Sequence, residues 1–198
     1  MRAVESLLPV PLNGRFVTLE PLEPRHHADL IALAEADPAI FRYMPIDPAG
    51  GFAPRLAYAT EQNAKGAWIT FVVRRNSDGA VAGSTSYMAI TPGDAKVEIG
   101  FTWYAAAAQA TAVNPECKLL LLENAFRAGY NRVELKTDAK NARSRAAILK
   151  LGAVEEGTLR AHMWMPQGYF RDTVYFSILA AEWPGVRARL EARLAAFS

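Results

Sequence analysis

A chain of 198 residues is long enough to bury a sizeable core, and we expect one domain over residues 1–198. Its composition, with 51% hydrophobic and 21% charged residues, is ordinary for a globular protein, and a net charge of +2 gives no electrostatic reason to expect nucleic-acid binding. The single cysteine, Cys117, excludes an intrachain disulfide and a cysteine-based metal site.

The three histidines lack metal-ligand spacing, so no metal is expected. The N-terminal region has no apolar stretch of signal-peptide length, and no apolar run approaches the length of a membrane span. We therefore expect a cytoplasmic protein without a membrane partner.

The first half of the chain alternates helices and strands. Apolar periodicity predicts a strand over residues 15–21, a helix over 25–36, a turn-rich segment over 38–48 and a helix over 54–65. Strands over 68–75 and 81–90 follow, and Asn76-Ser77-Asp78-Gly79 between them is a strong hairpin signal.

The second half is organised around a strand, a long helix and another strand. A strand over 96–104 runs into a loop of small residues, and the helix over 115–128 has Asn114 as its cap and Pro115 at its first position. The next strand, over 132–138, makes this unit a crossover between parallel neighbours. A short helix over 142–151, strands over 154–159 and 173–179 with an irregular segment between them, and a helix over 181–196 complete an α+β domain.

The loop before the long helix is a candidate anion site. Unpaired backbone N–H groups and the helix dipole favour a phosphate or pyrophosphate at a helix N-terminus. The residues concerned are Gln109, Ala110, Thr111, Ala112, Val113 and Asn114. A well-capped connection without a ligand would use the same residues, so the spacing alone leaves both interpretations open.

Strict alternation along the strand over 96–104 separates two sets of side chains, Ile99, Phe101 and Trp103 on one face and Glu98, Gly100 and Thr102 on the other. A glutamate beside a glycine indicates a cavity wall with a carboxylate aimed into it, because glycine weakens a strand without an evident structural need. A solvent-facing glutamate on a half-exposed strand is the alternative.

A second constellation stands at the start of the short helix, where Asn141 and Ser144 have the spacing of an N-cap and its partner. Capping accounts for Asn141, so contact with a ligand would be an additional role. The basic residues nearby either bind phosphate or form a solvated face: Lys136, Lys140, Arg143, Arg145 and Lys150.

In these residues the chain resembles the GNAT superfamily of acyl-CoA-dependent N-acetyltransferases, and within it the ribosomal-protein-alanine N-acetyltransferase (RimJ/RimL-like) type. The likeness extends from residues 14–22 to residues 177–184. Its most specific parts are Glu98-Ile99-Gly100-Phe101-Thr102-Trp103, the loop over 109–114, Lys136-Thr137-Asp138, and Asn141-x-x-Ser144 leading to Lys150-Leu151-Gly152.

The resemblance implies a three-layer α+β fold whose mixed, mostly antiparallel sheet is splayed between the strands over 96–104 and 132–138. It implies acetyl-CoA as co-substrate, with the pantetheine arm along Phe101, Thr102 and Trp103 and the pyrophosphate on the loop over 109–114. Asn141 would bond the pantetheine arm, Ser144 would lie near the sulfur, and Arg143 would join the cofactor-binding set. An acceptor pocket would be lined by the first helices and by a segment containing His162, Trp164 and Tyr169.

Two departures from the family pattern bear on function. The family loop commonly has glycine where this chain has Ala110 and Ala112, and an alanine with positive φ stores roughly 1–2 kcal/mol of strain, enough for about tenfold weaker cofactor binding. Many members also carry a tyrosine acid near the end of the short helix, where this chain has Ile148 and Leu149. Ser144 is the substitute.

The reaction implied is direct attack of a neutral amine on the thioester, with Glu98 as the base, directly or through water, and with Cys117 outside the mechanism. An α-amine with a pKa of ~8 is about one unit from neutral at pH 7, which costs roughly 1.4 kcal/mol, whereas a lysine amine at ~10.4 costs more than three times as much. This favours a peptide N-terminus or an amino-acid-like small molecule as acceptor.

Two other functions remain open. The chain could be a non-catalytic acyl-CoA-binding module, a sensor or interaction domain, or a fold retained for protein contacts without coenzyme A. Acceptor specificity would reside in residues 36–55 and 162–170, where spacing carries no readable chemistry. A homodimer through a sheet edge or the C-terminal segment is compatible with the pattern.

Overall fold

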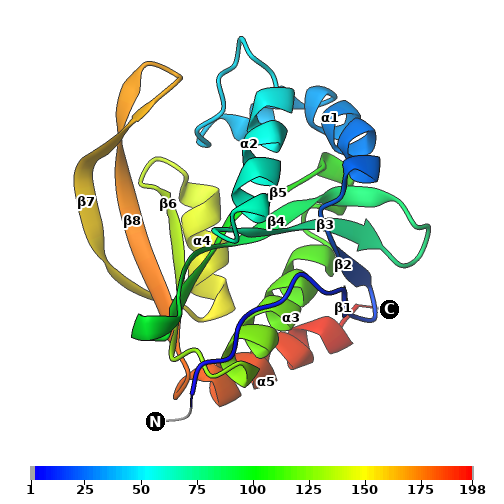
Figure 1. The fold of residues 1–198 in the computed structure, drawn as a ribbon. Helices are drawn as coiled ribbons and strands as arrows, with labels where there is room; N and C mark the ends of the chain where they lie inside the picture. Colours follow the sequence, from blue (N-terminus) through cyan, green and yellow to red (C-terminus); the bar gives the residue numbers. More distant parts are fainter. Residues whose placement is uncertain (1–2, 198) are drawn as a thin grey trace.

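The structure is a computed structural model that describes residues 3–197, within which the strands form one mixed sheet of eight (Figure 1). The strands are β1 (Leu12–Asn13), β2 (Val17–Pro21), β3 (Ile69–Arg75), β4 (Val81–Thr91), β5 (Lys96–Tyr104), β6 (Arg132–Asp138), β7 (Val154–Met165) and β8 (Tyr169–Leu179). The helices are α1 (His27–Glu35), α2 (Ala53–Ala64), α3 (Val113–Arg127), α4 (Ala142–Leu151) and α5 (Trp183–Ala195). Short 3₁₀ segments link several of them.

The strand order is β1-β2-β3-β4-β5-β6-β8-β7, and every neighbouring pair is antiparallel except β5 and β6. The helix α3 connects these two parallel strands, as the crossover predicted from the sequence requires. The α+β class with a mixed, mostly antiparallel sheet is therefore confirmed.

Pairing between β5 and β6 covers only the first part of each strand. Lys96, Val97 and Glu98 lie opposite residues 132–134, and no pairing joins the two strands beyond them. On its other side β6 stays paired with β8 as far as Asp138. The sheet therefore opens between β5 and β6, which confirms the expected splay.

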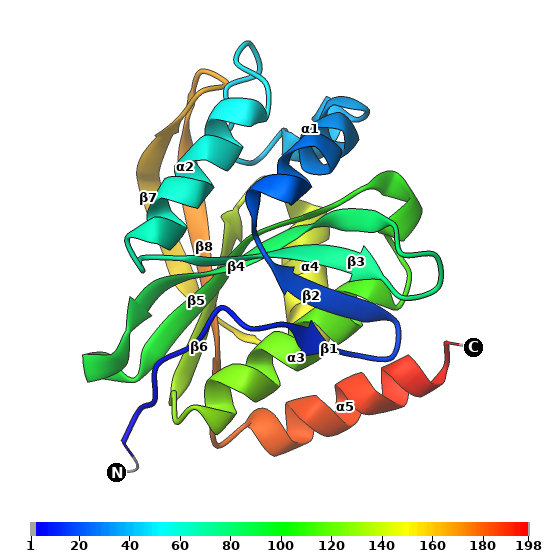
Figure 2. The ribbon, with the colours of Figure 1, turned by 45° about the vertical axis from the view of Figure 1, so that its right-hand side comes forward.

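Helices cover both faces of the sheet, giving three layers (Figures 1 and 2). On one face α3, α4 and α5 enclose a core that includes Leu121, Ile148 and Val186, which we call the lower core. On the other face α1 and α2 enclose a smaller core around Leu30 and Leu56, which we call the upper core. The opening between β5 and β6 therefore lies between two cores that pack separately, one on each face of the sheet.

The β7–β8 hairpin is longer than the sequence predicted. The segment between the strands expected over 154–159 and 173–179 is regular, because the strands extend to Met165 and begin at Tyr169. The irregular appearance of the sequence has a physical cause in a register shift between Leu159 and Met163, with Ala161 at a φ of +47°. A bulge of this kind interrupts the period-two pattern without ending the strand.

Two helices begin later than predicted, because a turn takes the place of their first residues. The first predicted helix begins as a 3₁₀ turn over Pro24–His26, and α1 follows it. The last helix begins at Trp183 instead of residue 181, because Glu182 Oε2 accepts the backbone N–H of Leu179 and holds the preceding residues in a turn. These are shifts of one or two residues at element ends.

A buried carboxylate joins the start of β2 to the first turn of α3. Glu116, only 4% exposed, accepts the backbone N–H groups of Arg15, Phe16 and Val17 at 2.9, 2.6 and 2.7 Å. This explains why β2 begins at Val17 and not at residue 15, since two of the preceding N–H groups are bound to a side chain. A Cβ on Gly14 would lie 2.5 Å from the carboxylate, so glycine is required there.

We expect Glu116→Ala to lower the free energy of unfolding by roughly 3–5 kcal/mol, because three backbone donors lose a charged acceptor inside the protein. Urea unfolding followed by circular dichroism measures the change. Glu191→Ala is the matched control, because that exposed glutamate pairs only with Arg187 and its loss should change stability by about 0.5 kcal/mol or less. Equal effects of the two substitutions would contradict the structural role that we assign to the Glu116 carboxylate.

Candidate active site

The loop from β5 to α3 presents free backbone N–H groups. The helix begins at Val113, two residues earlier than predicted, so Asn114 and Pro115 lie inside its first turn and Asn114 is not the cap. The cap is supplied by the loop itself, since Thr111 Oγ1 accepts the N–H of Val113 at 3.2 Å and donates to the carbonyl of Ala108. Within the described residues the N–H groups of Ala110, Ala112 and Asn114 have no hydrogen-bond partner.

Ala110 adopts the left-handed backbone conformation, with a φ of +60°, whereas Ala112 has a φ of −66°. The strain anticipated for alanine in this loop therefore falls on one of the two residues. Gln109 Nε2 donates to the carbonyl of Tyr104 at 2.8 Å and fixes the opposite end of the loop. The loop is thus held in a shape that leaves N–H groups unpaired at the positive end of a helix dipole.

A bulge in β5 changes which residues share a face. Ser84 lies opposite Trp103 and Ser86 opposite Gly100, so two steps on β4 match three on β5, and Phe101 has a φ of +50°. The prediction that Ile99 shares a face with Phe101 and Trp103 is wrong. Ile99 packs in the lower core, whereas Phe101 and Trp103 pack in the upper core, because the extra residue reverses the alternation.

Glu98 lies on the upper face, beside the bulge, with 8% of its surface exposed. Its Oε2 forms an ion pair with Lys136 Nζ of β6 at 2.7 Å. Burial on its own would lower the pKa of Lys136, but the ion pair with Glu98 outweighs it and the pKa is raised. The solvent-facing alternative for Glu98 is therefore wrong.

Gly100 has a structural role that the sequence did not reveal. A Cβ at this position would lie 2.8 Å from Glu98 Oε1 and 3.0 Å from the sulfur of Met88. The missing side chain therefore provides the space that the Glu98 carboxylate occupies.

The start of α4 matches its prediction. Asn141 Oδ1 accepts the backbone N–H of Ser144 at 3.0 Å, so the capping role is confirmed, and the helix ends at Gly152 in the left-handed conformation. Among the described residues the Asn141 amide nitrogen has no partner. Of the basic residues nearby, Lys136 pairs with Glu98, Lys140 lies over the ring of Tyr169 and Arg145 pairs with Glu155, while Arg143 and Lys150 are exposed.

Lys118 is a buried cation at the splay that sequence reasoning missed. It is 6% exposed, its Nζ donates to Thr102 Oγ1 of β5 at 2.8 Å, and burial lowers its pKa to about 8. No carboxylate among the described residues forms an ion pair with it. Its position three and four residues before Leu121 and Leu122, on the buried stripe of α3, was the signal that could have revealed it.

Arg55 of α2 is a second cation without an acidic partner in the described residues. Its guanidinium carbon lies 3.7 Å from the ring centroid of Phe101 and 4.7 Å from that of Trp68. Burial lowers the pKa of Arg55 to about 10. The arginine therefore packs against the side chain of the bulged residue, Phe101.

The two segments expected to determine acceptor specificity meet. Gln167, at the tip of the β7–β8 hairpin, donates from Nε2 to the carbonyls of Met44 and Ile46 at 3.0 and 3.1 Å. This contact joins the hairpin to the loop between α1 and α2 on the upper side of the sheet (Figure 1). Tyr169, two residues beyond Gln167, is half-buried and donates to Asp138 Oδ2 at 2.5 Å.

The aromatic and sulfur residues of the hairpin have different environments. Trp164 is 59% exposed and contacts Phe170, which is also exposed, so Trp164 does not line the enclosed face. His162 bonds Thr173 through Nδ1 at 3.0 Å and contacts the ring of Tyr175. Met165 is fully buried.

Cys117 is fully buried, and burial raises the pKa of its thiol to about 12. A thiol in this environment is neither a thiolate at neutral pH nor accessible, which supports its exclusion from the chemistry. Ile148 is buried and Leu149 exposed at the end of α4. Within residues 3–197, no three histidine, cysteine, aspartate or glutamate side chains are grouped as a metal site, and no helix is long and apolar enough to cross a membrane.

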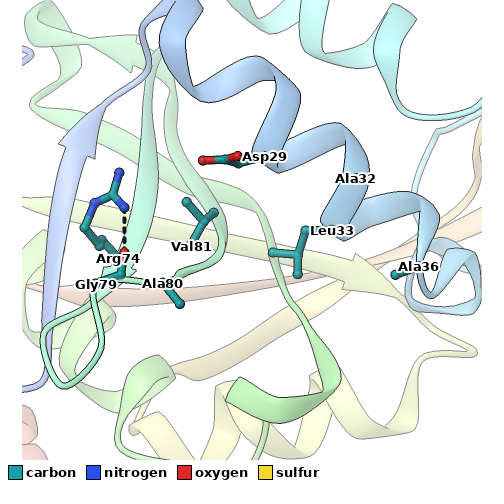
Figure 3. Close-up of a pocket in the computed structure, with 8 residues that line it drawn as sticks. All are labelled: Asp29, Ala32, Leu33, Ala36, Arg74, Gly79, Ala80 and Val81. Atoms are coloured by element: carbon teal, nitrogen blue, oxygen red, sulfur yellow. Dashed lines mark hydrogen bonds between the residues drawn. The ribbon is translucent and has the colours of Figure 1, made fainter.

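A separate hollow of about 450 Å³ lies between α1 and the β3–β4 turn (Figure 3). Its charged lining residues are Asp29 and Arg74. Arg74 is already bonded to the carbonyl of Gly79 and paired with Glu20. None of the predicted site residues lines this hollow, so it is not the candidate active site.

Comparisons with known proteins bear on the family and the fold of the chain. The family model described as acetyltransferase (GNAT) domain matches residues 17–154. A candidate ribosomal N-acetyltransferase of Bacillus subtilis, YdaF, is 30% identical over 109 residues, which cover 54% of this chain and 58% of that protein. The match thus spans less than two thirds of the curated relative.

Solved structures share the fold over nearly the whole chain. A GCN5-related N-acetyltransferase from Brucella melitensis superposes with a TM-score of 0.88 at 30% identity, covering 98% of this chain and 89% of that one. Mycobacterium smegmatis RimJ in complex with CoA-disulfide gives a TM-score of 0.77 at 23% identity, with 89% and 88% covered. The second likeness bears on the fold alone.

We expect Ala110→Gly to stabilise the protein by up to about 1 kcal/mol, because glycine relieves the left-handed strain at a φ of +60°. Ala112→Gly is the matched control. At a φ of −66° it relieves nothing and should destabilise by roughly 0.5–1 kcal/mol through the entropy of the unfolded chain. Urea unfolding measures both, and effects of the same sign would show that the loop strain is absent.

We expect Lys118→Met to stabilise the protein most at pH 7, by up to roughly 3 kcal/mol. Below pH 8 folded and unfolded Lys118 both carry the proton, so the full penalty of the buried charge is present. Between pH 8 and about 10.5 the folded lysine loses its proton while the unfolded one retains it, so the wild type gains stability and the difference shrinks.

Unfolding of both proteins at pH 7 and 9.5 tests this, and their difference cancels the other titrating groups. A difference independent of pH would mean that Lys118 is not a desolvated ammonium.

Proposed function

Because this chain belongs to the GNAT acetyltransferase family, we propose that it transfers the acetyl group of acetyl-CoA to a primary amine. The proposed acceptor is a protein or peptide α-amine or an amino-acid-like small molecule. The observation that carries the proposal is the opening between β5 and β6, which ends beside a helix start with free N–H groups and has Glu98 at its closed end. We further propose that residues 1–198 act as one such domain in the cytoplasm.

The residues around the opening fit coenzyme A. Beyond Glu98 one edge of β5 has no strand partner, so Phe101, Thr102 and Trp103 can offer backbone groups to an extended amide-containing arm. The loop from Gln109 to Asn114 offers N–H groups to a pyrophosphate. Asn141 has a free amide nitrogen, with Arg143 and Ser144 beside it, so these residues complete the proposed cofactor-binding set.

When bound, acetyl-CoA supplies a thioester carbonyl for direct attack by an unprotonated amine. We assign Glu98 to accept the proton of the amine, directly or through water, and Lys136 to hold its carboxylate in place. A backbone N–H in the segment from Phe101 to Trp103 is the proposed donor to the thioester oxygen. Ser144 is the proposed donor to the leaving sulfur, since α4 supplies no tyrosine there.

Two observations favour an α-amine acceptor. A carboxylate is a weaker base than an amine, which favours an acceptor whose pKa lies only about one unit above pH 7. The name of the B. subtilis relative, a candidate ribosomal N-acetyltransferase, supports a protein acceptor. A non-catalytic acyl-CoA-binding module is the alternative, favoured by the strained Ala110 and the missing tyrosine.

Calorimetric titration with acetyl-CoA, followed by turnover with N-terminal peptides, tests the proposal. Micromolar binding with turnover supports the enzyme, whereas binding without turnover of any amine supports the module. No binding at millimolar acetyl-CoA would show that the Ala110 loop does not hold the pyrophosphate and that the fold serves another purpose.

We expect Glu98→Gln to lower kcat by roughly 100-fold or more, while the dissociation constant of acetyl-CoA changes less than about twofold. Glu134→Gln is the matched control, because Glu134 forms a comparable ion pair with Arg132 at 2.9 Å and takes no part in the proposed site. Asn141→Ala should instead weaken acetyl-CoA binding, and it should also destabilise α4 by about 1 kcal/mol through loss of the cap. Unchanged turnover in Glu98→Gln would remove Glu98 from the mechanism.

A further inference from the structure

Arg171 of β8 is a buried cation without a partner. It is 9% exposed, it forms no hydrogen bond or ion pair with any described residue, and its Nε atom is enclosed and unbonded. Burial lowers the pKa of Arg171, although Asp138 and Glu98 are near enough to oppose that effect. Buried charges in proteins are normally paired, because an unpaired one loses its hydration without compensation.

The carboxylates around Arg171 are already bonded to other groups. Glu98 pairs with Lys136 at 2.7 Å. Asp138 accepts the Tyr169 hydroxyl at 2.5 Å and the backbone N–H of Lys140 at 2.8 Å. Both carboxylates, of Glu98 and Asp138, are therefore bonded to other groups, and the guanidinium of Arg171 has no bonded partner among the described residues.

The side chain of Arg171 lies on the face of the sheet that carries the upper core, where we propose that the acceptor binds. Val174 and Phe176 of β8 pack in the lower core, so Arg171, Thr173 and Tyr175 alternate onto the opposite face. That face also carries Glu98 and lies next to the contact between Gln167 and the α1–α2 loop. Because α3 packs on the other face, phosphates bound at its N-terminus are not placed to pair with Arg171.

We propose that Arg171 binds a carboxylate of the acceptor substrate, an inference that rests on the proposed function. The acceptor would place its amine at Glu98 and its carboxylate at Arg171, within one enclosed face. A guanidinium suits this role because its planar donors bind a carboxylate through two parallel hydrogen bonds. The carboxylate is either the α-carboxylate of a free amino acid or an acidic side chain near a peptide N-terminus.

Two matched acceptor pairs identify the source of the carboxylate. L-alanine against L-alaninamide tests the α-carboxylate, and a peptide amide with glutamate at its second position against its glutamine counterpart tests the side chain. We expect the acid of one pair to be preferred at least about tenfold in kcat/KM by the wild type. Equal rates within both pairs would overturn the proposal and leave the proposed acetyl transfer standing.

Arg171→Met should abolish that preference by lowering kcat/KM for the acid alone, with acetyl-CoA affinity unchanged, and Arg171→Lys should restore part of it. If Arg171 only maintains the fold, its replacement would lower kcat/KM equally for both acceptors of a pair. That result would overturn the proposal. The fold should survive, since replacing a buried charge by an apolar side chain of similar size is often neutral. Arg160→Met, at an exposed arginine of β7, is the matched control and should leave the preference intact.

Calorimetric titration of the preferred acid in the presence of coenzyme A gives a readout besides activity. Binding that Arg171→Met weakens at least about tenfold supports the carboxylate site even if no acceptor is turned over, in which case the proposed reaction alone fails. Binding that is equal in the wild type and Arg171→Met overturns the site.

Discussion

The candidate site depends on where the parallel pairing of β5 and β6 ends. Three register pairs hold the strands together, and the last of them is Glu98 with Glu134. Continued pairing would bury the edge of β5 in the sheet and leave no backbone group for a ligand. The bulge at Phe101 begins just beyond the last pair and turns the strand away, so one local irregularity both ends the ladder and reverses the side-chain alternation.

Unpaired charge is concentrated around this opening. Lys118 lies below β5, Arg55 packs on Phe101 above it, and Arg171 of β8 lies near enough to Glu98 to feel its charge. Each is removed from water without an ion-pair partner in the described residues, which reduces stability. By contrast, the buried charge of Glu116 is matched, because its carboxylate accepts three backbone donors. The contrast indicates that the opening is adapted to a ligand at the expense of stability.

Local rules predicted the elements whose ends are set by their own residues. Asn141 and Gly152 bound α4 as the sequence indicated, because a cap and a left-handed glycine act within a few residues of the helix. The start of α3 was misjudged because Thr111 and Ala112, not Asn114, end the loop. The faces of β5 and the length of the hairpin were missed for one shared reason, since bulges at Phe101 and Ala161 break the period of two. The partners of Glu98 and Lys118 lie on other elements of the fold, and spacing along the chain carries no information about such contacts, nor about the burial of Arg171 without a bonded partner in the described residues.

The environment of Cys117 has a consequence for how opening of the fold can be followed. Its thiol is fully enclosed between α3 and the sheet, and its raised pKa keeps it protonated at neutral pH. An alkylating reagent can therefore reach it only when α3 separates from the strands. Because the chain has one cysteine, the rate of labelling reports that single event. A ligand that bridges β5 and the start of α3 would slow labelling in proportion to its occupancy, without contacting the sulfur.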